Sequence, residues 1–179
     1  GESKEPAESG PHILVSCGGD GWMPFVHRSV EAWDLIGNQF GGGRMTIMMP
    51  LHNSANARNR LVSELQGTNV TIQDFATDFL SRLQVADLSI SQAGYNTSMN
   101  LLETRRWSIL VPHPDKVDQL LRSPRFVERG LAQTIHPNDL RAELLATAIR
   151  IAFSQPPPQH DIDLDGAAQT PATLQAVAS

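Results

Sequence analysis

Hydrophobic and polar positions follow two alternating patterns along most of the chain. Short runs of apolar residues, typical of buried strands, are separated by longer segments in which apolar residues recur every three or four positions, typical of helices. The short runs predict strands at 13–15, 45–49, 69–72, 88–91, 107–111 and 132–135. The longer segments predict helices at 25–36, 54–65, 77–85, 97–105, 115–129 and 137–153.

This alternation of strand and helix predicts an α/β fold, a Rossmann-like parallel sheet with helices on both faces. Such sheets bind ligands at the carboxyl ends of their strands, so the segments after the first, third, fourth and fifth strands are candidates for a site. We expect one domain at 11–154. Residues 1–10 read as a disordered segment or linker remnant of a longer protein, and 155–179 as a proline-rich linker followed by a short helix from Ala167.

Composition narrows the class of protein. Hydrophobic residues make up 40% of the 179 residues and charged residues 18%, which indicates a globular domain, and the net charge of −5 gives no general reason to bind nucleic acid. No apolar stretch reaches the roughly 18 residues of a membrane span. The single cysteine, Cys17, excludes an internal disulfide and is expected to be a buried, reduced thiol, which fits a cytoplasmic protein.

A glycine-rich turn follows the first strand. Gly18, Gly19, Asp20 and Gly21 precede a helix, where free N–H groups and bare backbone suit a phosphate, although a tight strand–helix turn explains the glycines equally well. Asp20 either contacts a sugar hydroxyl or points away. The turn lacks the third glycine of a dinucleotide fingerprint, and no acid ends the second strand, so NAD binding is not expected.

A second polar turn follows the fourth strand. Gly94, Tyr95, Asn96 and Thr97 open a helix, and a helix N-terminus with such donors is a ready diphosphate site. Ordinary N-capping by Asn96 or Thr97 is the simpler alternative. Asn100, one helical turn further, lies on the same face.

No metal site is predicted. The string from Asp161 to Gly166 imitates the start of an EF-hand loop, but Ala172 occupies the position of the bidentate glutamate. The histidines are scattered, and none forms a ligand pair at helical spacing. His113, which follows the fifth strand, is the one histidine at the predicted ligand edge.

Several strings together resemble the C-terminal domain of family 28 glycosyltransferases, which is the C-terminal half of a GT-B fold. The resemblance extends over nearly the whole chain. The strings resemble, in particular, those of a group of predicted bacterial glycosyltransferases of unsettled substrate. The strings that carry it lie at 86–97, 101–102, 110–112 and 119–122.

The resemblance implies a role for each matched position. In that family this domain holds the donor, usually a UDP-sugar. Residues 18–21 would face the diphosphate or the sugar, Phe75 and Ala76 would pack on the base, and residues 94–97 would bind the phosphates. Gln119 would contact the donor sugar. Asn100 stands where the family commonly has a glutamate on the ribose hydroxyls, and an amide bonds a diol without charge-assisted strength.

The implied mechanism needs no metal or other cofactor, because helix N-termini and amides stabilise the departing diphosphate. The group that deprotonates the acceptor would belong to an N-terminal acceptor-binding domain, so this chain alone is expected to bind donor weakly and transfer nothing. Three alternatives stay open: half of a nucleotide-sugar 2-epimerase, a non-catalytic nucleotide-sugar-binding module, and a Rossmann-like domain whose glycines are only turns.

Overall fold

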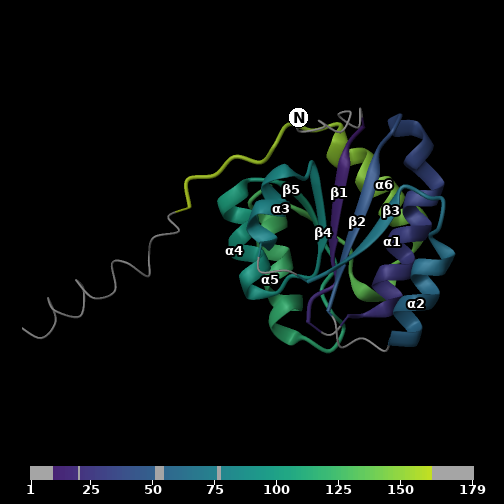
Figure 1. Cartoon of the computed structure of the whole chain (residues 1–179). Helices are drawn as coiled ribbons and strands as arrows, with labels where there is room; N and C mark the ends of the chain where they lie inside the picture. Colours follow the sequence, from purple (N-terminus) through teal and green to yellow (C-terminus); the bar gives the residue numbers. More distant parts are fainter. Residues whose placement is uncertain (1–9, 20, 51–54, 76–77, 163–179) are drawn as a thin grey trace, which may run out of the picture.

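The computed structural model describes residues 10–19, 21–50, 55–75 and 78–162, and the structural statements below concern these residues. Its centre is a single parallel sheet with the strand order β3-β2-β1-β4-β5-β6 (Figure 1). All the predicted strands are present, as β1 (His12–Ser16), β2 (Arg44–Met49), β3 (Val70–Asp74), β4 (Leu88–Ser91), β5 (Trp107–Leu110) and β6 (Gln133–Thr134).

Helices cover both faces of the sheet, as the alternating pattern predicts. They are α1 (Met23–Ile36), α2 (Ala55–Glu64), α3 (Phe79–Val85), α4 (Tyr95–Thr104), α5 (Val117–Glu128) and α6 (Ala142–Phe153), with short 3-10 helices η1 (Gly37–Phe40) and η2 (Pro137–Asp139). Apolar side chains of α1, α2 and α6 pack on one face, and those of α3, α4 and α5 pack on the other.

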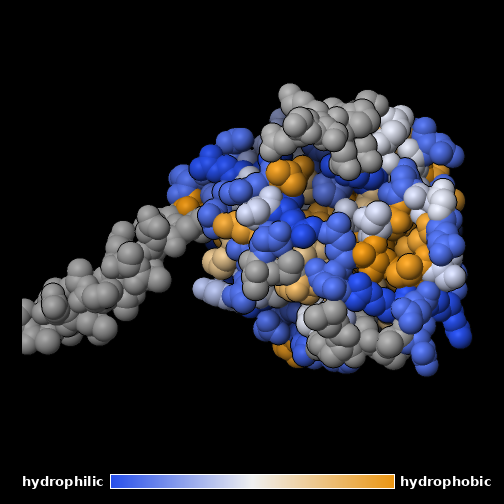
Figure 2. All heavy atoms as spheres, viewed as in Figure 1, coloured by the Kyte–Doolittle hydropathy of each residue, from blue (hydrophilic) through white to orange (hydrophobic). Residues whose placement is uncertain are grey.

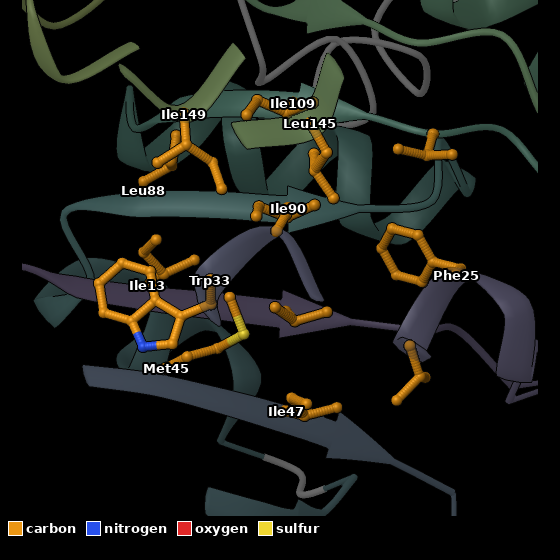
Figure 3. Packing of buried hydrophobic residues seen from close by; sticks show 14 of the residues in the cluster. Ile13, Phe25, Trp33, Met45, Ile47, Leu88, Ile90, Ile109, Leu145 and Ile149 are labelled. Carbon is orange, nitrogen blue, oxygen red and sulfur yellow. The ribbon is translucent and has the colours of Figure 1, made fainter. Parts of the chain in front are cut away.

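Alternation along the strands divides the core into these two layers. Ile13 and Val15 of β1 point to the α1–α6 side, whereas Leu14 between them points to the α3–α5 side. Figure 3 shows the first layer, where Trp33 of α1 and Leu145 of α6 pack over neighbouring strands. Strands buried on both faces explain the continuous apolar runs in the sequence.

The helix starts differ from the sequence prediction by one or more residues, and two of the differences change how the sequence is interpreted. The segment 137–153 is not one helix, because Leu140 and Arg141 are extended and separate η2 from α6. Helix α4 begins at Tyr95, two positions before the predicted start at Thr97. The predicted helix cap at Thr77 and the helix from Ala167 lie outside the described residues.

The segment after α6 returns across the domain instead of leaving it. The Trp107 indole N–H donates to the carbonyl of Pro156, and Nε2 of His160 lies 2.8 Å from the carbonyl oxygen of Leu102. Ile162 packs against the apolar layer under α3, α4 and α5. The proline-rich segment therefore contacts the sheet and α4 as far as residue 162.

Figure 2 shows the surface of the domain in the view of Figure 1. This surface is mostly hydrophilic, with hydrophobic residues gathered toward the β2–β3 side. In the part of the chain that the structure describes, no helix combines the length and the apolarity of a membrane span.

Two buried serines, Ser89 of β4 and Ser29 of α1, give a stability prediction. The Ser89 hydroxyl is fully buried and has no hydrogen-bond partner among the described residues, whereas the equally buried Ser29 donates to the carbonyl of Phe25 at 2.9 Å. We expect Ser89→Ala to raise the free energy of unfolding by about 1 kcal/mol and Ser29→Ala to lower it by a similar amount. Urea unfolding of both variants checks this, and a loss of stability in Ser89→Ala would show that its hydroxyl is satisfied.

Candidate functional site

The site lies where the order of strands along the sheet reverses. From β1 the chain moves outward through β2 and β3, then returns to the other side of β1 as β4 and continues to β5 and β6. The carboxyl ends of β1 and β4 are adjacent, since Ser16 pairs with Ser91. The turns after these strands therefore leave the sheet side by side, at its lower end in Figure 1. Such a reversal point is where open α/β sheets bind ligands.

A pocket of about 440 Å³ opens at this point. It is formed by the turns that follow β1, β3 and β4, together with the N-terminal turns of α4 and α5. Its lining residues are Gly18, Gly19, Phe75, Gln92, Gly94, Tyr95, Asn96, Thr97, Lys116, Asp118 and Gln119. The two turns singled out in the sequence thus face one pocket from the same edge of the sheet.

The turn after β1 requires glycine at position 18 and exposes the backbone at position 19. Gly18 has a φ of 66°, and a Cβ there would lie 2.7 Å from Oε1 of Gln92. Gln92 is held in place, because its Nε2 donates to the carbonyl of Cys17 at 3.0 Å. At Gly19 a Cβ would meet nothing within 4 Å, so its backbone is open to a ligand. Gly21, whose N–H donates to Gly18, closes the turn and lies outside the pocket lining.

Helix α4 opens into the pocket without a side-chain cap. Its N-cap residue is Gly94, which has extended backbone, and Ser98 N–H donates to the Gly94 carbonyl at 2.9 Å. Asn96 and Thr97 lie in the first turn and do not cap it, so the N-capping alternative is wrong. No acidic residue occupies this turn. Uncapped first-turn N–H groups and the positive end of the helix dipole make this end of α4 suited to an anion.

The side chain of Gln119 is oriented by a backbone contact. Gln119 is 8% exposed, and its Oε1 accepts a hydrogen bond from the N–H of His113 at 2.9 Å. This bond fixes the amide so that Nε2 lies on the side of Gly94, 4.0 Å from the position of a Cβ there. A buried amide with an oriented N–H₂ group is suited to bond a ligand oxygen.

His113 itself lies outside the pocket lining. Its ring packs edge-on against Trp22, with centroids 5.2 Å apart, and its Nδ1 accepts from the N–H of Asp115 at 3.2 Å. The contribution of His113 to the site is therefore made by its backbone through Gln119. No pattern in the sequence indicates that Trp22 is its neighbour.

Asn100 is also outside the lining, although it shares a helix face with Asn96. Because α4 begins at Tyr95, Asn100 lies about 7.5 Å along the helix from its first residue. Asp20 and Ala76, which the sequence also suggests for the site, lie outside the described residues.

Three lining residues were missed by sequence reasoning: Gln92, Lys116 and Asp118. Gln92 follows β4 directly, and Lys116 and Asp118 lie at the start of α5. The signal that could have identified them is their polar character at the end of a predicted strand or the start of a predicted helix. Phe75 was expected there, and its ring is 41% exposed and stacks on Phe79 at 5.8 Å between centroids.

Cys17, directly before the glycine turn in the chain, is a buried free thiol, as expected. Its Sγ donates to the carbonyl of Met48 at 3.0 Å, and burial raises the pKa of the thiol from 9.0 to about 12. A thiol with this pKa is uncharged at neutral pH and is not a nucleophile there.

This raised pKa predicts a loss of stability in alkali. In the unfolded chain the thiol ionises near pH 9, while in the folded chain it stays protonated to about pH 12. The contribution of the buried, protonated thiol to the free energy of unfolding is therefore complete below pH 9. It is lost as the pH rises from 9 to about 12, at up to about 1.4 kcal/mol per pH unit. Urea unfolding at about pH 8 and about pH 10 should show a steeper fall for the natural chain than for Cys17→Ala. Equal slopes would contradict the raised pKa.

Comparison with known proteins finds relatives that match most of this chain. A curated relative from Anaeromyxobacter sp. (strain Fw109-5), UDP-N-acetylglucosamine--N-acetylmuramyl-(pentapeptide) pyrophosphoryl-undecaprenol N-acetylglucosamine transferase, is 33% identical over 150 residues. The match covers 82% of this chain but only 38% of the relative.

Solved structures share the fold. The crystal structure of Acinetobacter baumannii MurG matches with a TM-score of 0.67 at 21% identity, covering 83% of this chain and 42% of that one. A putative UDP-N-acetylglucosamine 2-epimerase from Listeria monocytogenes matches with a TM-score of 0.62 at 13% identity, covering 87% and 40%. Residues 13–163 match the model of the glycosyltransferase family 28 C-terminal domain, and the chain belongs to that family.

Proposed function

We propose that this chain is the donor-binding domain of a glycosyltransferase and binds a nucleoside-diphosphate sugar in the pocket between β1 and β4. One observation carries the proposal: the uncapped N-terminus of α4 faces the bare backbone of Gly19 across a single pocket. Backbone amides at a helix N-terminus bind phosphate groups, and a turn without side chains lets a diphosphate approach closely.

The lining suggests how the donor lies. The diphosphate binds at the first turn of α4, near Asn96 and Thr97. The N–H₂ group of Gln119 bonds a hydroxyl of the sugar, which is uncharged and offers both donors and acceptors. The exposed ring of Phe75 offers an apolar surface for the base. A UDP-sugar is the proposed donor, in keeping with the name of the curated relative.

The proposed reaction is transfer of a hexosyl group to an acceptor. The amides of α4 stabilise the negative charge of the departing nucleoside diphosphate, a role that needs no metal ion. Because the chain spans 38% of the length of its curated relative, an additional N-terminal domain is proposed to bind the acceptor and supply the base. The free thiol of Cys17 is compatible with the reducing cytoplasmic setting that we include in the proposal.

Isothermal titration of the 179-residue chain with UDP-sugars and dTDP-sugars tests the proposal. We expect weak, saturable binding of the nucleotide sugar and of the nucleoside diphosphate, with no sugar released over many hours. Absence of binding to every nucleotide would favour a domain whose glycines are only turns. Multiple turnovers by this chain alone would contradict the assignment of the acceptor-activating base to another domain.

A further inference from the structure

Arg122, in the second turn of α5, joins the helix N-termini that form the pocket. Its Nη1 donates to the carbonyl of Ala93 at 2.6 Å and to Oδ2 of Asp118 at 3.2 Å. The centre of its guanidinium group lies 5.8 Å from the centroid of the Tyr95 ring. A single side chain of α5 thus contacts the residue before the α4 N-cap, the first residue of α4 and a carboxylate of the pocket lining.

The contact to Ala93 fixes the position of the α4 N-terminus. Ala93 is fully buried and precedes Gly94, so its carbonyl has no helical partner of its own on α4. A charged guanidinium donor gives this carbonyl a strong, directional hydrogen bond from the neighbouring helix. The first turn of α4, whose amides face the pocket, is thereby held against α5.

Arg122 is also paired with Asp118, an acidic residue of the pocket lining. Asp118 is the acidic residue among the described residues of the lining, and its carboxylate is 62% exposed. A carboxylate beside the α4 N-terminus repels a bound diphosphate, and this repulsion is weakened when a cation is paired with it. Arg122 is the more enclosed partner, at 23% exposed, while solvent reaches the carboxylate and partly screens the pair.

We propose that Arg122 is a positioning residue that makes the pocket accept a diphosphate, by holding the α4 N-terminus through Ala93 and by offsetting the charge of Asp118. The inference rests on the proposed function and adds a residue outside the pocket lining that sets its selectivity for anions. Arginine suits the role, because one planar group reaches a carbonyl, a carboxylate and an aromatic ring together.

The same helix provides a matched control. Arg122, Arg125 and Arg129 line an apolar groove of about 260 Å³ between α4 and α5. Arg125 is exposed and has no contact with Ala93 or with the pocket lining among the described residues. Replacing Arg125 removes the same charge from the same helix without touching the connection to α4.

The test compares UDP with uridine, which lacks the charged diphosphate, by titration calorimetry on the full chain. Arg122→Met keeps the apolar stem, and we expect it to lower the affinity for UDP ~10-fold and that for uridine less than ~3-fold. Adding Asp118→Asn should restore most of the UDP affinity. Arg122→Lys keeps the charge and should retain the UDP-to-uridine ratio better than Arg122→Met, and Arg125→Met should leave both affinities unchanged.

A ligand-free measurement separates this inference from the proposed function. In Arg122→Met, but not in Arg125→Met, we expect the backbone amide resonances of Tyr95 and Asn96 to shift. Equal loss of UDP and uridine affinity, or a loss that Asp118→Asn does not reduce, would overturn the electrostatic role. Unshifted amides would overturn the positioning role. If the natural chain binds neither ligand, the proposed function fails, while the resonances still report whether Arg122 positions α4.

Discussion

Replacing Asn96 with aspartate is expected to weaken UDP binding by ~10-fold or more, because it places a carboxylate beside the proposed diphosphate position at the α4 N-terminus. The same substitution should leave the fold intact or stabilise it by about 0.3–1 kcal/mol, since an acidic side chain in the first turn of a helix interacts favourably with the helix dipole. Titration calorimetry and urea unfolding of the variant measure the two effects.

The opposite signs of these effects make the test specific to the pocket. Asn38→Asp adds the same charge in η1, which precedes β2 and so lies at the other edge of the sheet. We expect this control to leave UDP affinity unchanged. If Asn96→Asp bound UDP as tightly as the natural chain, the diphosphate would not lie at α4.

Gly18→Ala is expected to have the largest effect on stability among substitutions in the pocket. The residue has a φ of 66°, and its new methyl group would lie 2.7 Å from Oε1 of Gln92, which cannot move without losing its bond to Cys17. We expect the free energy of unfolding to fall by about 2 kcal/mol, from backbone strain and the displacement of Gln92. UDP affinity should fall as well, because the turn and Gln92 both line the pocket.

Gly19→Ala, one residue away, is the matched comparison. Its methyl group would meet nothing within 4 Å, and its φ is not positive, so urea unfolding should show little change. UDP affinity should nevertheless decrease, because the methyl group occupies the space in which a ligand would contact the backbone of residue 19. Equal stability of the two variants would show that Gly18 is not held in the left-handed conformation.

The fold was predictable from the sequence because burial on both faces leaves a strong local signal. The apolar runs from Ile13 and Met45 mark strands that lie at the centre of the sheet, and the helical stripes between strands bury one face each. Two turns of the site were equally visible, since Gly18 and Gly94 follow strands whose carboxyl ends a parallel sheet brings to one edge.

The remainder of the site depends on contacts between residues far apart in the sequence. Asn96 and Thr97 are both good helix caps by residue type, and only the bond from Ser98 to Gly94 shows that α4 begins before them. His113 was expected at the ligand-binding site because it follows β5, but its ring packs against Trp22. The sequence pattern predicts that Arg122 lies in a helix, but it does not indicate the hydrogen bond from Arg122 to the carbonyl of Ala93.

The central claim is that the turn after β1 and the N-terminus of α4 bind one diphosphate between them. The most direct test is a titration of the isotope-labelled chain with a UDP-sugar, following the backbone amide resonances by NMR. The account predicts that the amides of Gly18, Gly19, Tyr95, Asn96 and Thr97 shift together with one dissociation constant. Shifts confined to one of the two turns, or to residues elsewhere on the domain, would contradict it.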